Sequence, residues 1–290
     1  TQQVTLRSNF TLNGTHSVFF DQPGVVMTFA EKESKDAPRN GRGSDGTPFA
    51  FDVVVSADAE PGVRELRVAT DQAVSSVSHL MVTDYPVFRE DEQTANDTRD
   101  QAVAVTLPVA ICGRVERAED VDFFSFEGKA GQQITADLFA QRVTAGLHGM
   151  VVRGPLIYLM DGLMTLYGPN GQVVAQNDNF YGGDSFIGFT LSEDGRYCLE
   201  VRDARYAGSG RYVYCVELAS RPYAHATFPL SVQSGTTTAA VAIGHGLGES
   251  TDVELRGTTD AEPGIVRQRL QTGAGETNPV SIIVSEHPQA

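Results

Sequence analysis

Short runs in which hydrophobic and polar residues alternate dominate this chain. Clear examples lie at residues 49–55, 63–68, 122–126 and 197–201. Alternation with a period of two places one set of side chains on each face of an extended strand. Gly, Pro, Asn and Asp separate these runs, and they favour turns. Because a helical period is nearly absent, the pattern predicts an all-β protein built from β-sandwiches.

A segment near the end of the first third of the chain occurs again at the C-terminus. Residues 56–86 align without a gap with residues 258–288, at an offset of 202, and nine of the 31 positions are identical. Apolar positions match as well, as with Val63 and Ile265. Each copy predicts a Pro-Gly turn, a strand, a polar loop and a final strand. We therefore expect two related modules around a different middle domain, with domains at residues 1–86, 87–220 and 221–290.

The middle segment carries a series of motifs that resemble one known family. The motifs are DVDFF at 120–124, KAGQ at 129–132, PNG at 169–171, VAQNDN at 174–179 and DGRY at 194–197. In this order they resemble the bacterial pre-peptidase C-terminal (PPC) domain. The resemblance implies a jelly-roll-like β-sandwich of the kind appended to secreted peptidases and other exported proteins. The flanking modules resemble the Ig-like segments that accompany PPC domains in large exported proteins of planctomycete type.

The charge balance excludes two classes of partner. The chain has 37 acidic and 22 basic residues and a formal net charge of −15. Such a chain repels nucleic acid and anionic lipid headgroups, so we expect no nucleic-acid partner. The sequence holds no apolar run long enough for a membrane helix. Because it starts at Thr1 with no Met, we expect a secreted or cell-surface chain whose export signal has been removed.

Carboxylate and amide oxygens gather in one loop of the middle segment. Asn177, Asp178, Asn179 and Asp184 lie within eight residues, and Asp161 precedes a nearby predicted strand. Calcium takes six to eight oxygen ligands, which flexible loops can supply. The PPC resemblance also implies calcium in comparable loops. These five residues are thus a candidate calcium site, and calcium is the one cofactor we consider. The alternative is an ordinary polar turn.

Three cysteines allow one intramolecular disulfide. A hairpin loop is predicted at 207–210, and Cys198 and Cys215 lie symmetrically about the point between Tyr206 and Ala207, so in a simple hairpin they would face each other across two adjacent strands. A Cys198–Cys215 disulfide is one hypothesis, and a pair of buried thiols is the other. Under the first hypothesis Cys112 remains free.

The segment 150–164 is unusually apolar for a loop of a sandwich. If it is exposed, its centre would be a partner-docking surface. The alternative is a pair of strands buried in the core. The four candidate docking residues are Ile157, Tyr158, Leu159 and Met160.

The sequence contains no recognisable catalytic motif. None of the six histidines lies in a zinc-protease motif or beside a nucleophile-elbow serine. We therefore predict a non-catalytic, secreted structural or adhesion protein that docks onto other proteins or onto copies of itself in an extracellular assembly. The alternative is a module that targets a secreted hydrolase to polysaccharide or matrix protein.

Overall fold

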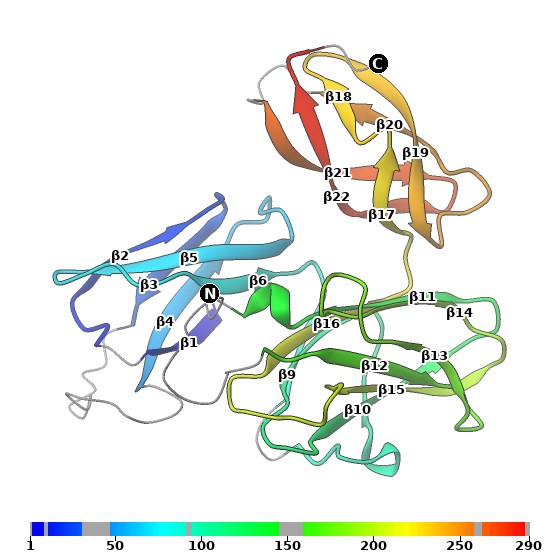
Figure 1. Cartoon of the computed structure of the whole chain (residues 1–290), viewed down its shortest axis with the longest axis horizontal. Coiled ribbons are helices and arrows are strands. Elements are labelled where there is room, and N and C mark those ends of the chain that lie inside the picture. Colours follow the sequence, from blue (N-terminus) through cyan, green and yellow to red (C-terminus); the bar gives the residue numbers. More distant parts are fainter. Residues whose placement is uncertain are drawn as a thin grey trace.

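The protein is nearly all-β, as the alternating pattern predicts. The computed structural model describes residues 2–8, 11–30, 47–90, 94–144, 159–257 and 263–287. In these ranges the chain forms 22 strands and two single-turn 3₁₀ helices. No helix in the described ranges is long and apolar enough to cross a membrane. The strands form six sheets, which pack in pairs into three bodies (Figure 1).

Six strands build the first body, the N-terminal module: β1 (Gln2–Ser8), β2 (Thr15–Phe20), β3 (Val25–Phe29), β4 (Thr47–Val55), β5 (Gly62–Thr70) and β6 (Ser78–Val82). They form two three-stranded antiparallel sheets, β1-β4-β3 and β2-β5-β6. Alternate residues of β4 and β5, such as Phe51 and Leu66, are buried between the two sheets. The period of two in the sequence therefore places the core of this module.

Ten strands and both 3₁₀ helices build the middle domain: β7 (Val87–Arg89), η1 (Arg99–Gln101), β8 (Val103–Ala104), β9 (Val109–Arg114), β10 (Val121–Gly128), β11 (Gln133–Phe139), η2 (Gln141–Val143), β12 (Gly162–Tyr167), β13 (Val173–Asn177), β14 (Phe186–Thr190), β15 (Gly195–Asp203) and β16 (Val213–Ala219). Sheet I has the order β13-β12-β15-β10-β8, and sheet II has the order β14-β11-β16-β9-β7. The largest apolar cluster of the described chain lies between them and includes Phe124, Leu138 and Val216.

Six strands build the C-terminal module: β17 (Tyr223–Phe228), β18 (Ser231–Gln233), β19 (Thr237–His245), β20 (Asp252–Arg256), β21 (Gly264–Thr272) and β22 (Gly275–Ser285). They form the sheets β17-β19-β20 and β18-β22-β21. Leu255 and Ile282 are among the residues buried between these sheets.

The internal repeat of the sequence is also a repeat of strand pairing. In the N-terminal module Gly62 pairs with Val82 in the β5–β6 hairpin. In the C-terminal module Gly264 pairs with Val284 in the β21–β22 hairpin, which is the same register moved by 202 residues. The two hairpins therefore present equivalent positions to equivalent faces.

The N-terminal module packs on the outer face of sheet II. Val63 and Met81, which pair across β5 and β6, lie against a small apolar cluster on that face. The cluster consists of Ala110, Phe139 and Cys215. This contact joins two domains through side chains that point away from the core of each.

The predicted Cys198–Cys215 disulfide is wrong. Cys198 lies on β15 in sheet I, whereas Cys215 lies on β16 in sheet II, so the two strands are not neighbours. The chain crosses from one layer of the sandwich to the other between them, where the sequence had suggested a simple hairpin. Cys215 instead pairs with Cys112 of β9, and the two Sγ atoms are 3.4 Å apart.

Candidate functional site

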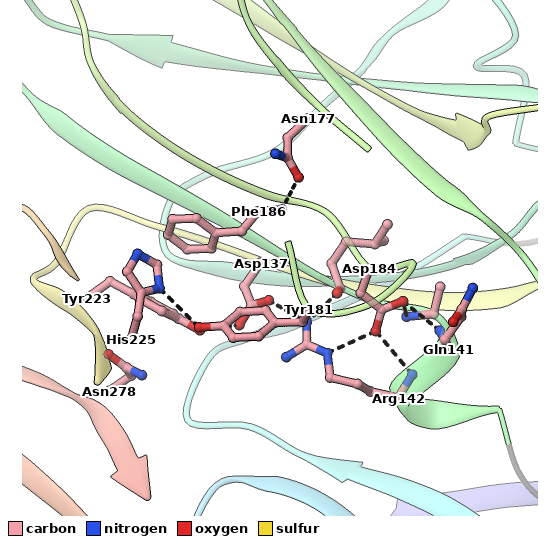
Figure 2. Close-up of polar contacts among 12 residues, drawn as sticks. Asp137, Gln141, Arg142, Asn177, Tyr181, Asp184, Phe186, Tyr223, His225 and Asn278 are labelled. Carbon is pink, nitrogen blue, oxygen red and sulfur yellow. Dashed lines mark hydrogen bonds and ion pairs between the residues drawn. The ribbon is translucent and has the colours of Figure 1, made fainter. Parts of the chain in front are cut away.

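Polar and aromatic side chains meet where the middle domain joins the C-terminal module (Figure 2). Asp137 lies near the end of β11, Arg142 lies in η2, and Tyr223 belongs to β17. The Arg142 Nη2 donates to Asp137 Oδ1 over 2.6 Å, and the Tyr223 hydroxyl donates to Asp137 Oδ2 over 2.6 Å. Burial raises the pKa of Asp137, and Arg142 and Tyr223 oppose that rise by binding the ionised form. One buried carboxyl thus connects two domains.

Asp184 anchors the same junction from the loop that follows β13. Its carboxylate is fully buried and accepts the backbone N–H groups of Ala140, Gln141 and Arg142 over 2.6 to 3.1 Å. It also accepts the Arg142 Nε over 2.9 Å (Figure 2). Four donors therefore engage both oxygens, and the carboxylate fixes the start of η2.

An aromatic cluster surrounds His225 on the module side of the junction. The Tyr181 hydroxyl lies 3.0 Å from His225 Nδ1, and the rings of Phe180 and Phe186 lie 4.6 and 4.7 Å from the imidazole. Burial, followed by the nearby His245, lowers the pKa of His225, because both disfavour the imidazolium. His225 is therefore neutral near pH 7 and packs as an aromatic ring.

The structure does not assemble the predicted calcium shell. Asp184 is engaged as described, and Asn177 Oδ1 accepts the Phe186 N–H over 3.1 Å. Asp178 and Asn179 are exposed, and the Asp161 N–H donates to Asp203 over 2.8 Å. In the described ranges, no group of three or more His, Cys, Asp and Glu side chains is placed to hold a metal ion. Backbone hydrogen bonds that join Phe180 and Tyr181 to Asp184, together with the bond from the Phe186 N–H to Asn177, hold this loop.

The predicted docking residues lie partly outside the described ranges. Ile157 and Tyr158 lie outside the described residues. Leu159 is half-buried and its carbonyl oxygen accepts Arg205 Nη2 over 3.0 Å. Met160 is 1% exposed and belongs to the core between sheets I and II, so its assignment to an exposed surface was wrong. Burial of this apolar side chain stabilises the folded domain.

A second polar site, which the sequence analysis did not predict, lies beside β9 and β10. It is a pocket of about 660 Å³ whose lining includes Glu90, Asn96, Asp122 and Tyr214. The Tyr214 hydroxyl donates to Asp122 Oδ2 over 2.8 Å, and Asn96 Nδ2 donates to Glu90 Oε1 over 2.7 Å. Burial, followed by the charge of Glu90, raises the pKa of Asp122 to about 8. The available signal was the second Asp of the DVDFF motif.

The three bodies and their junctions define the class of this protein. It is a multi-domain β protein in which a ten-stranded sandwich carries a smaller β module on each of two contacts. Residues 120–203 match the family described as the bacterial pre-peptidase C-terminal domain. The segment 120–203 of the middle domain is therefore similar to PPC domains, which confirms the resemblance over these residues.

The chain is also similar to proteins of known name. It is 29% identical over 201 residues to a probable subtilase-type serine protease of Deinococcus radiodurans, which covers 57% of this chain and 26% of the relative. The chain thus spans about a quarter of that relative. The solved PPC domain of a collagenase from Bacillus anthracis is 15% identical and covers 40% of this chain and 93% of its own, with a TM-score of 0.30. The lysozyme inhibitor PliG of Aeromonas hydrophila is 17% identical and covers 41% and 97%, with a TM-score of 0.27.

Proposed function

We propose that this chain is a non-catalytic docking region of a secreted protein, and that it accompanies a serine protease domain. The match to a subtilase-type protease over about a quarter of that protein's length supports the association with a protease. The PPC match supports a secreted setting. The chain would hold protein surfaces in fixed positions through the outer faces of its sandwiches.

The main support is the way in which the middle domain is used in this structure. Its sheet II receives the N-terminal module on one face, and Asp137 near the end of β11 receives the C-terminal module through Tyr223. The polar groups at the second contact are consumed by one another, because Asp184, Asp137 and Arg142 are mutually hydrogen-bonded or ion-paired. This chemistry favours rigid attachment over the turnover of a substrate.

Small-angle scattering of the purified chain tests the docking role. We expect one compact arrangement of the three bodies, unchanged between low and moderate salt. The Tyr223→Phe variant lacks the hydroxyl that binds Asp137, so it perturbs the junction and is expected to give a larger radius of gyration than wild type. A wild-type chain that scatters as three freely moving bodies would contradict the proposal.

Activity and retention assays separate the remaining functions. We expect no hydrolysis of casein and no labelling by a fluorophosphonate probe, which reacts with activated serines. Labelling would show that the chain itself is an enzyme. Strong retention on insoluble collagen or chitin would favour the alternative of substrate targeting over docking.

A further inference from the structure

Cys112 and Cys215 occupy a position in sheet II that suits a covalent cross-link. They are direct partners in the antiparallel pair β9–β16. The Cys112 carbonyl accepts the Glu90 N–H on the opposite edge of β9, over 3.0 Å. Since that backbone group points away from β16, Cys112 and Cys215 form a non-hydrogen-bonded pair, the type in which opposite residues lie closest, with Cα atoms about 4.5 Å apart. A disulfide requires Cα atoms about 4.4 to 6.8 Å apart.

We propose that Cys112 and Cys215 form a cross-strand disulfide when the chain meets a disulfide-bearing oxidant, such as a thiol-disulfide oxidoreductase or oxidised glutathione. Cys112 is half-buried and Cys215 is buried, so the oxidant reaches Cys112 first. The Cys112 thiolate attacks the oxidant, forms a mixed disulfide and releases one thiolate. The Cys215 thiolate then attacks the Cys112 Sγ and releases the second thiolate of the oxidant. The protein loses two protons and two electrons, and the oxidant takes both electrons.

The location of the cross-link gives it a structural consequence. It joins residues 103 positions apart in the chain and closes β9 onto β16. Cys215 also belongs to the cluster that receives Val63 and Met81 of the N-terminal module. The disulfide therefore stabilises the surface on which the N-terminal module is docked.

Thiol titration of the unfolded chain tests the pairing. After incubation with oxidised glutathione and removal of excess oxidant, wild type is expected to show one thiol, from Cys198, compared with three after reduction. The Cys198→Ser control is expected to show none after oxidation, and Cys112→Ser and Cys215→Ser are expected to form no intramolecular disulfide. Reduction is expected to lower the Tm of wild type and of Cys198→Ser. Three free thiols in oxidised wild type, or a cross-linked peptide that contains Cys198, would overturn the assignment.

A different observation concerns two exposed isoleucines of the C-terminal module. Ile265 and Ile283 pair across β21 and β22, and they are 76% and 47% exposed. Their counterparts in the repeat are Val63 and Met81, which pair in the same register and pack on sheet II. One copy of the hairpin therefore uses this apolar pair as a contact, and the other copy leaves it open to solvent.

The polar edge of that contact is repeated as well. The Thr83 hydroxyl accepts the Tyr85 N–H over 3.2 Å and donates to Glu217 of sheet II over 2.6 Å. At the equivalent place in the C-terminal module, the Ser285 hydroxyl accepts the His287 N–H over 3.1 Å. Ser285 can thus donate its hydrogen in the direction that Thr83 uses.

Part of this face already has a neighbour within the chain. Arg267 Nη1 donates to the Pro61 carbonyl oxygen over 2.6 Å, and Arg269 is ion-paired with Asp84 of the N-terminal module. These arginines lie farther along β21 than Ile265. The open part of the face is therefore its end at Ile265 and Ile283.

We infer that this end, formed by Ile265, Ile283 and Ser285, is a docking surface for the outer face of a second PPC-type sheet. The partner chemistry follows from the contact that the N-terminal module makes, which is an apolar patch like Ala110, Phe139 and Cys215 beside a half-buried carboxyl like Glu217. The inference deepens the proposed docking function. Its failure would leave the scattering test of the single chain unaffected.

Exposure of sheet II in the full chain provides the test. The Val63→Asp/Met81→Asp variant is expected to release the N-terminal module and to offer sheet II to the Ile265 end of another copy. Sedimentation velocity is expected to show concentration-dependent association of this variant, while wild type stays monomeric. Adding Ile265→Asp and Ile283→Asp is expected to abolish the association.

Hydrogen exchange keeps that test decisive. Faster exchange at the amides of β9 and β16 reports that sheet II has been released, and the milder Val63→Ala/Met81→Ala variant serves if the charged variant does not fold. A released sheet II without association would overturn the inference. Association that persists in the fourfold variant would also overturn it, because it would then arise from another surface.

Discussion

Asp122 makes the folded protein sensitive to pH in a direction that can be worked out from its surroundings. Its side chain is 2% exposed, and burial together with Glu90 raises its pKa from the usual 3.8 to about 8. As pH rises above about 4, the unfolded chain releases this proton while the folded chain retains it. The stability that the proton provides is complete below pH 4 and is lost progressively until the folded group also ionises, near pH 8.

The size of this effect follows from the shift of the pKa. Each unit corresponds to about 1.36 kcal/mol, so a shift of about four units gives an upper bound of roughly 6 kcal/mol. Because Glu90 lies beside Asp122 and its pKa is also raised by burial, the two carboxyls share the cost. We therefore expect the free energy of unfolding of wild type to fall by about 2 to 5 kcal/mol between pH 4 and pH 8 because of this group.

The Asp122→Asn variant removes the ionisation and keeps the shape. The amide oxygen of the new side chain can accept the Tyr214 hydroxyl, and its amide nitrogen can donate to Glu90, as the protonated acid does. In urea unfolding with a chelator present, we expect the Asp122→Asn variant to match wild type near pH 4 and to be more stable at pH 8 by about 2 to 5 kcal/mol. Asp97→Asn, which changes an exposed carboxylate of the same pocket, is the control and should alter stability by less than about 0.5 kcal/mol. If Asp122→Asn destabilises the chain equally at both pH values, the reasoning is wrong.

The remaining predictions concern the junction with the C-terminal module and the Asp184 loop beside it. Tyr223→Phe leaves the buried Asp137 without one donor and should cost about 1 to 3 kcal/mol in urea unfolding, and a change below about 0.5 kcal/mol would mean that the hydroxyl does not connect the domains. Asp184→Ala leaves three backbone N–H groups and the Arg142 Nε without their acceptor, and it should cost about 3 to 5 kcal/mol in urea unfolding. Calcium should not change the Tm of wild type, and a Tm rise with calcium would restore the predicted site. Because the pKa of His225 is lowered in the folded chain, the unfolded chain binds a proton there at higher pH than the folded chain, and acid should weaken the junction. After correction for intrinsic rates, we expect the amides of β17 to exchange hydrogen faster at pH 5 than at pH 7. The His225→Phe variant should suppress this difference.

The local pattern of residues was sufficient to predict the class of the fold and the internal repeat. The alternating runs 49–55 and 63–68 became β4 and β5, because a period of two is a property of each strand by itself. The gapless repeat of 56–86 predicted a strand, a loop and a final strand in each copy, and the structure has β5 and β6 in the first copy and β21 and β22 in the second. The ordered motifs from DVDFF to DGRY located the segment that matches the PPC family for the same reason, since the residues of each motif are consecutive.

Contacts between residues far apart in the sequence could not be predicted from local pattern. Cys198 and Cys215 looked like hairpin partners from their spacing, but the chain crosses between sheets there, and Cys112, 103 residues from Cys215, is the neighbour. Asp184 looked like a cation ligand until the fold placed η2 and Arg142 around it.

What the sequence alone determined is the all-β class of the fold, the alternating faces of its clearest strands, and the similarity between the two outer modules. Those properties follow from backbone geometry over a few residues and from similarity between two stretches of one chain. Only the tertiary structure decided which outward faces meet, as with Val63 on sheet II and Tyr223 on Asp137. The physical reason is that such contacts depend on the order of strands in the sheets and on how sheets pack, which no local pattern of residues specifies.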